Sequence, residues 1–381
     1  MKTRTSKIKS KGQLNSRRSF LKGATALGTA AALGPWIADE AFSSSGNLNL
    51  LTWSGYLPMS FAEKFKSETG ITIKQTVVGS TDEQLQKLKL VSDSGYDLVS
   101  PSIDQGGRWQ DSGLLGTFDQ SRIDNSAILP SMLRISESFS WDSEMRHVPF
   151  LWGSEALGYR VDKYSAIYGK LSFGDLWRPE MRGKIMVRPH TMMAGIGRFL
   201  EGVGEIPPFI EGYSDEDKMR LIWDKILKFS VTHKPWIKKY WNNAEDQSDG
   251  FMRGGIVLGQ VWENPSQSLF KEGRPVRYLA PREGAFAWLD GLSIPTGAKN
   301  IDAIYEFVKF AAQPENGALL ANETGYNSAV SGAVNHLTNE NKKAYNSAYP
   351  DDAIDRLWSW PSTKPWYREL RRQYLQKFVV A

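Results

Sequence analysis

The chain has 381 residues, and since hydrophobic cores stop growing at roughly 250–300 residues, about two domains are expected. Its 17 Phe, 14 Tyr and 14 Trp exclude a disordered protein, and the absence of cysteine excludes disulfides, thiolate metal sites and a cysteine nucleophile. The formal net charge of +5 would suit a nucleic-acid-binding protein only if the basic residues belonged to the folded part.

The basic residues are concentrated at the amino terminus. Residues 1–38 contain eight basic residues and no acidic one, and their uncharged run 23–34 is shorter than the roughly 20 residues of a membrane-spanning helix. Segment 16–22 reads S-R-R-S-F-L-K, which resembles the consensus of twin-arginine export signals. We therefore assign residues 1–45 to a signal and linker, rather than to a basic tail or an uncleaved anchor, and expect export to the periplasm by the twin-arginine machinery. Without residues 1–38, 39 basic and 42 acidic residues remain, so no nucleic-acid partner is expected.

Apolar periodicity predicts alternating strands and helices along the rest of the chain. The expected strands are 48–53, 71–78, 96–99, 185–187, 255–262 and 276–279. The expected helices are 60–70, one that begins at 81, 192–200, 214–229, 301–312 and 366–380. Strands and helices that alternate in this way are typical of an α/β fold with largely parallel sheets.

Several local features of these elements can also be expected. Ser60 should cap the first helix, and Gly70 should end it. Ile71, Ile73 and Val77 alternate with other residues and should share one face of the second strand. A second α/β region is expected to begin near Leu151.

Aromatic and acidic residues follow the predicted strands, at the position where open α/β sheets bind ligands. The candidate binding residues at these strand ends are Trp53, Tyr56, Ser102, Trp262 and Glu263, and later loops add Trp288, Asp290 and Tyr326. Aromatic faces attract cations, and a carboxylate forms a charge-assisted hydrogen bond with an ammonium group. Taken singly, each tryptophan could be a packing residue, Glu263 could cap a helix, and Tyr326 could belong to a turn. Together they indicate a site for a cationic solute.

The sequence resembles the periplasmic spermidine/putrescine-binding proteins of ABC transporters, in order over almost the whole chain after the signal. The segments that carry the resemblance are LLTWSGY (50–56), FKSETGI (65–71), YDLVSPS (96–102), PFLWG (149–153), DLWRPE (175–180), WLDGLSIP (288–295) and ETGY (323–326). The resemblance implies a two-lobed, hinged solute-binding fold of type II, in which each lobe is a mostly parallel sheet flanked by helices. Lobe I is expected at 46–150 plus 291–330, and lobe II at 151–290 plus 331–381.

The resemblance also implies a role and a set of contacts. It implies a monomeric receptor without a cofactor, which captures a polyamine between its lobes and delivers it to the permease subunits in the inner membrane. Trp53, Tyr56, Trp262, Trp288 and Tyr326 match aromatic walls of the family's site. Asp290 matches the carboxylate that holds a ligand amine, and Ser102 follows the third-strand motif.

One segment departs from the family pattern. Polyamine binders of this family carry an acidic pair after the strand that here ends at 187, whereas this chain has Arg188 and His190 there and no acid in 188–193. Glu263 or Asp104 could supply the missing charge, because a buried ammonium without an anionic partner is costly. Alternatively, Arg188 and His190 could bind a carboxylate, and the solute would then be a zwitterionic or quaternary-ammonium compound such as an amino acid derivative or a betaine.

Two other classes of protein fit this sequence less well. An exported enzyme is the main alternative, with His190 as a possible base, but the four histidines lack metal-ligand spacing and no catalytic motif is present. A structural or adhesion protein has no reason to gather aromatic residues at strand ends. We therefore expect neither catalysis nor a bound metal.

Overall fold

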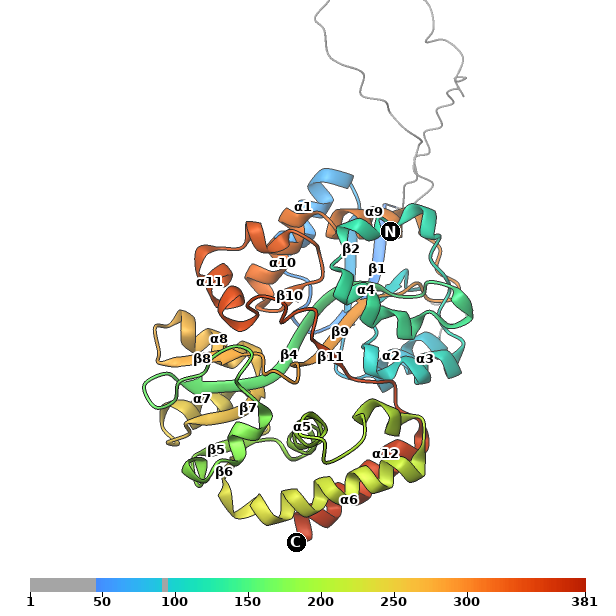
Figure 1. Ribbon diagram of the computed structural model, residues 1–381. Coiled ribbons are helices and arrows are strands. Elements are labelled where there is room, and N and C mark those ends of the chain that lie inside the picture. Colours follow the sequence, from blue (N-terminus) through green and yellow to red (C-terminus); the bar gives the residue numbers. More distant parts are fainter. Residues whose placement is uncertain (1–45, 91–94) are drawn as a thin grey trace, which may run out of the picture. The chain divides into compact units, whose positions relative to one another are not determined.

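The structure is a computed structural model that describes residues 46–90 and 95–381 (Figure 1). The twin-arginine segment 16–22 and the rest of the predicted signal and linker, 1–45, lie outside these residues. Within the described part, no helix combines the length and the apolar character that a bilayer-spanning segment requires.

The first α/β unit is a three-stranded parallel sheet, as predicted. Its strands are β1 (Asn47–Trp53), β2 (Thr72–Val78) and β3 (Leu98–Val99), and β1 lies between the other two. The helices of this unit are α1 (Met59–Thr69) and α2 (Thr81–Leu90). Gly70 ends α1 in a left-handed conformation with φ of 73°, which glycine adopts without steric cost.

One local prediction in this unit is wrong. Pro58, not Ser60, is the N-cap of α1, and the Ser60 hydroxyl instead donates a hydrogen bond to Glu323 at 2.6 Å. Ile71, Ile73 and Val77 have the same parity along the regular register of β2, but their face is covered unequally, because Ile71 is buried whereas Val77 is 49% exposed. Alternation alone could not show which face of an edge strand is covered.

The second sheet has eight strands and is built around one long strand, β4 (Val148–Arg160). The others are β5 (Ile185–Val187), β6 (Ile237–Tyr240), β7 (Leu258–Trp262), β8 (Val276–Leu279), β9 (Phe286–Leu292), β10 (Asn327–Ser328) and β11 (Trp358–Ser359). Every strand that pairs with β4 is antiparallel to it, and the parallel pairs are β5 with β6, β5 with β7, and β9 with β11. The α/β class is therefore correct, but this sheet is mixed rather than mostly parallel.

Of the twelve α-helices in the described residues, the six expected ones are all present and six were not predicted; ten follow those of the first unit. They are α3 (Gly106–Ser112), α4 (Pro130–Ser136), α5 (Pro189–Gly202), α6 (Glu216–His233), α7 (Ala244–Met252), α8 (Glu263–Lys271), α9 (Ile301–Ala311), α10 (Pro314–Thr324), α11 (Asn339–Ala348) and α12 (Pro365–Val380). On α9 the predicted apolar face is buried at Ile304, Tyr305 and Val308, whereas Ile301 in its first turn is 40% exposed. Short 3₁₀ helices complete several connections.

The strand β9 links the two sheets. It pairs with β4 in the larger sheet, and the two run side by side through the described part (Figure 1). Beyond its end, Ser293 bridges to Val99 of β3, and within β9 Asp290 bridges to Ser102. Strand β9 therefore places Asp290 beside the carboxyl end of a strand of the first sheet.

Gly291 makes this crossing possible. Its backbone N–H donates to the Pro101 carbonyl at 3.2 Å, and the imidazole of His147 packs directly against its Cα. A β-carbon at position 291 would overlap that ring and lie 2.6 Å from the Val148 carbonyl oxygen.

Substitution of this glycine should destabilise the protein. We expect Gly291→Ala to reduce the free energy of unfolding by about 1–3 kcal/mol, because neither the buried ring nor the backbone can move without other shifts. Gly202→Ala, where the added carbon would meet only the Glu283 side chain at 3.8 Å, is the control and should leave stability nearly unchanged. Urea denaturation of both variants measures the difference, and equal midpoints would contradict the packing described here.

Candidate functional site

A single pocket of about 1240 Å³ collects the strand-end residues. It lies between the ends of β1, β2 and β3 on one side and β7, α7 and α8 on the other, with β9 contributing Trp288 and Asp290. Nine of the ten predicted binding residues line it, namely Trp53, Tyr56, Ser102, Arg188, Trp262, Glu263, Trp288, Asp290 and Tyr326. The tenth, His190, does not.

Asp290 is a buried carboxylate in the wall of the pocket, and the residue is 5% exposed. The Tyr56 hydroxyl donates to its Oδ2, while its Oδ1 is buried without a hydrogen-bond partner among the described residues. Burial raises the pKa of Asp290 to about 7, and the nearby Ser102 and Tyr56 hydroxyls only partly offset this effect. A carboxylate oxygen with no partner is suited to accept a hydrogen bond from a cationic ligand.

Aromatic rings form a continuous wall beside this carboxylate. The Tyr56 and Tyr326 ring centroids are 5.3 Å apart, and the Tyr326 and Trp288 rings meet edge to face at the same distance. Gly153 on β4 lies opposite Trp288 in the sheet, and a β-carbon there would overlap the indole. The glycine of the PFLWG segment therefore leaves the space that Trp288 occupies.

Glu263 is a second buried carboxylate that lines the pocket. It is the first residue of α8 and accepts hydrogen bonds from Tyr349, Asn327 and Gln267. Burial raises its pKa to about 7, against the effect of the Tyr349 and Asn327 hydrogen bonds. The alternative that Glu263 caps this helix is wrong, because the N-cap is Trp262 and no side chain forms a cap hydrogen bond.

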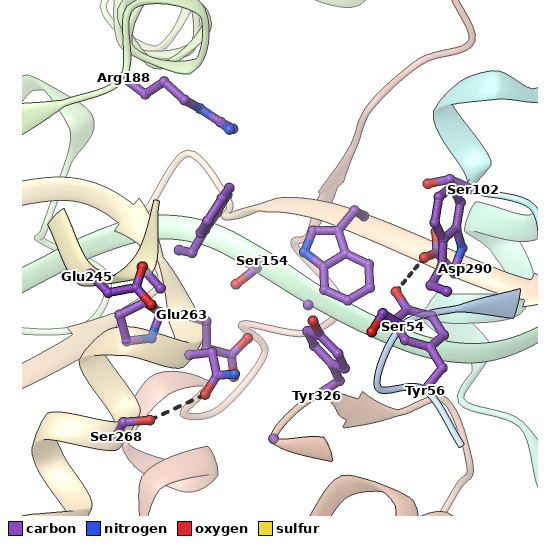
Figure 2. A pocket seen from close by; sticks show the side chains of 18 of the residues that line it. Ser54, Tyr56, Ser102, Ser154, Arg188, Glu245, Glu263, Ser268, Asp290 and Tyr326 are labelled. Atoms are coloured by element: carbon purple, nitrogen blue, oxygen red, sulfur yellow. Dashed lines mark hydrogen bonds between the residues drawn. The ribbon is translucent and has the colours of Figure 1, made fainter. Parts of the chain in front are cut away.

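Arg188 reaches toward the pocket, but its charge is already paired (Figure 2). Its Nη2 lies 2.9 Å from a carboxylate oxygen of Glu155 on β4, and its guanidinium lies over the rings of Trp262 and Trp241 at 5.1 and 4.7 Å. Glu155 was missed in the sequence because it lies within a run of buried residues on β4 that shows no alternation. Its pairing with Arg188 compensates the positive charge that the arginine would otherwise offer to a ligand.

The structure does not bring His190 to the pocket. Its imidazole stacks on Trp360, with centroids 5.4 Å apart, and contacts Arg371 of α12. Burial, followed by the charges of Arg371 and Arg188, lowers its pKa to about 3, so the ring is neutral at ordinary pH. His190 therefore connects the start of α5 to the carboxyl-terminal segment.

The pocket also includes residues that the sequence analysis did not select, and its charge is acidic. Its carboxylates are Asp104, Glu245, Asp249, Glu263 and Asp290, and its only lining cations in the described part are Arg188 and Arg253. Arg253 forms an ion pair with Asp249, so neither arginine is paired with Asp290 or Glu263. In the described ranges no three His, Asp or Glu side chains are arranged to hold a metal ion.

Comparison with known proteins identifies relatives over nearly the full chain. The spermidine/putrescine-binding periplasmic protein of Escherichia coli (strain K12) is 27% identical over 369 residues, which cover 95% of this chain and 97% of that protein. The putrescine-binding periplasmic protein PotF of the same organism is 26% identical over 320 residues, covering 78% and 82%.

A solved structure and two family models complete the comparison. The spermidine/putrescine ABC transporter substrate-binding protein PotD from Streptococcus pneumoniae superposes with a TM-score of 0.71 at 23% identity, covering 88% of this chain and 98% of that one, and the two-lobed solute-binding fold is thereby confirmed. The twin-arginine translocation signal model matches residues 15–34, which confirms the predicted export signal. The model described as bacterial extracellular solute-binding protein matches residues 60–347, and the chain belongs to that family.

Proposed function

We propose that this protein is the periplasmic substrate-binding component of an ABC transporter and that it captures a polyamine for delivery to a permease. The observation that carries the proposal is the buried Asp290 carboxylate, whose Oδ1 lacks a hydrogen-bond partner in the described chain and which stands beside three aromatic rings. An ammonium group would satisfy this oxygen and compensate its charge, and the methylene chain would pack on the rings. The curated relatives named as spermidine/putrescine-binding proteins agree with this chemistry.

The charge of the pocket favours a polycation over a zwitterion. A bound carboxylate would need a cation that is not already committed, but Arg188 is paired with Glu155 and Arg253 with Asp249. His190, the other residue expected to favour an anionic group, lies outside the pocket and is neutral. A betaine or an amino acid derivative is therefore the less well supported ligand.

Transport needs a receptor that changes shape with its ligand. We propose that the lobes 46–150 plus 291–330 and 151–290 plus 331–381 close over the polyamine, with β4 and β9 as the crossing strands. A ligand that touches both lobes favours the closed state by its differential affinity for it. The partners of this cycle are the solute, the permease subunits and, during export, the twin-arginine machinery. We propose that the receptor acts as a monomer and catalyses no reaction.

The role of Asp290 can be tested by removing its charge. We expect the wild-type protein to bind putrescine or spermidine in isothermal titration calorimetry, and Asp290→Asn to weaken binding about 10- to 100-fold, since a hydrogen bond to a charged group contributes roughly 1.5–3 kcal/mol. Asp111→Asn, at an exposed position on α3, is the matched control and should bind as the wild type does. Unchanged polyamine affinity in Asp290→Asn would refute the assignment of this anchor, and binding of betaines or amino acids alone would refute the polyamine assignment.

The pocket carboxylates also predict a pH dependence. Because their pKa values are raised to about 7, Asp290 and Glu263 hold protons in the free protein below that pH. An ammonium ligand favours the ionised forms, so binding must release these protons. We expect the affinity for putrescine to fall as the pH is lowered from 8 to 5, by up to about tenfold per pH unit for each carboxylate.

The free energy of unfolding of the ligand-free protein should rise as the pH is lowered from about 7 to 4, whereas the affinity for putrescine falls. Unfolded Asp and Glu ionise near pH 4, so these two groups stabilise the native state below that pH, and their contribution is lost as the pH rises from about 4 to 7.

Calorimetry of putrescine binding in buffers of different ionisation enthalpy measures the protons released on binding, and Asp290→Asn should release fewer. An affinity that is constant from pH 8 to 5 would contradict the proposed ion pairing.

A further inference from the structure

Glu155 and Arg188 form an ion pair across three strands of the larger sheet. Glu155 on β4 lies directly opposite Trp262 of β7 in the antiparallel register, so the two side chains share one face of the sheet. Arg188 follows β5, the other neighbour of β7, and its Nη2 lies 2.9 Å from the Glu155 carboxylate. Its guanidinium also lies over the Trp262 ring at 5.1 Å and over the Trp241 ring at 4.7 Å. One guanidinium therefore covers both a carboxylate and an indole face.

Arg188 takes the place that a ligand ammonium would otherwise find at this wall. A buried carboxylate and an aromatic face are the two kinds of group that bind an alkylammonium. Glu155 is 3% exposed and does not line the pocket, whereas the Arg188 side chain is 29% exposed and does. Burial raises the pKa of Glu155, and the charge of Arg188 is the largest effect that opposes this shift. The ion pair is neutral as a whole, but its positive member faces the pocket and its negative member lies behind.

The pocket wall at Trp262 is therefore unfavourable for a second cation. Like charges repel at short range, and the repulsion is stronger in a partly buried site than in water. In Figure 2 the Arg188 side chain extends from the start of α5 toward the pocket, on the opposite side of the view from Asp290. An amine that is held by Asp290 and extends toward Trp262 would meet the charge of Arg188.

The size of the pocket does not limit the length of the ligand. Its volume of about 1240 Å³ exceeds what a linear triamine fills, since pockets for drug-sized ligands have volumes of roughly 300–1,000 Å³. Length alone would therefore admit diamines and triamines alike. The charge of Arg188 distinguishes them, because only a triamine brings a third ammonium group into the pocket.

We propose that Arg188 is a specificity-determining residue that disfavours a third ammonium group, so that the receptor prefers diamines to triamines. This inference rests on the proposed function and narrows its class of ligand. The Glu155 carboxylate and the Trp262 face would otherwise bind the additional ammonium, but a cation of the protein itself already occupies them.

Putrescine and spermidine test the inference, because spermidine extends putrescine by one aminopropyl group and one positive charge. In isothermal titration calorimetry at pH 8 we expect the wild-type protein to bind putrescine at least about tenfold more tightly than spermidine. Arg188→Gln removes the repulsion and uncovers Glu155, so it should strengthen the binding of spermidine more than that of putrescine and abolish the preference. Arg372→Gln, which removes an exposed, ion-paired arginine of α12, is the control and should retain the wild-type ratio.

The possible results separate the inference from the function on which it rests. If neither amine binds the wild-type protein, the proposed function is wrong. If the wild-type protein binds spermidine at least as tightly as putrescine, or if Arg188→Gln keeps the preference for putrescine, the role of Arg188 is wrong and the function stands. If Arg188→Gln does not fold, the double variant Arg188→Gln with Glu155→Gln removes both members of the ion pair, and it should prefer putrescine less than the wild type does. An unchanged preference in the double variant would overturn the inference.

Discussion

The cost of burying a carboxylate without a cation is the constraint on which the pocket depends. Asp290 can remain at the crossing of β9 and β3 only because Tyr56 donates to one of its oxygens and because a raised pKa allows it to be neutral. In the ligand-free protein this carboxylate has no cationic partner among the described residues, and in the function proposed above a cationic solute would supply one. Of the aromatic side chains around it, Tyr56 donates a hydrogen bond, but none carries a positive charge that could form an ion pair with it.

The same constraint explains why the arginines of the pocket are bound to acids of their own. Arg188 would cancel the negative charge of the site if it were free, but Glu155 on β4 holds it at 2.9 Å and Trp262 and Trp241 cover its face. The guanidinium then serves as a flat, partly exposed part of the wall. Local pairing of this kind lets one pocket contain cationic side chains and still favour a cationic ligand.

The sequence predicted the site residues whose position follows from the nearby sequence. It missed those whose position depends on contacts with residues far away in the chain. Trp53 and Tyr56 could be placed because they end or follow the apolar run of β1, and strand ends meet at one edge of a sheet. Asp290 lies inside β9, a strand that the apolar runs did not predict, and it was placed by the family resemblance. Glu155 could not be placed, because β4 is buried along nearly its whole length and has no period to interpret. His190 was assigned to the site from its neighbours in sequence, whereas Trp360 and Arg371, about 170 and 181 positions later, decide where it lies.

The carboxyl-terminal segment contributes to the larger sheet and to its core. Strand β11 pairs with β9, and Tyr367 and Tyr374 of α12 are buried against the region of α6, where their hydroxyls bond to Tyr213 and Asp224. The partners in these contacts all precede the segment in the sequence. The larger sheet and its core are therefore incomplete until the carboxyl-terminal segment has been synthesised. Because Phe378 of α12 is buried in the same core, that core is complete only once synthesis has passed residue 378, which suits an export route that accepts proteins after they have folded.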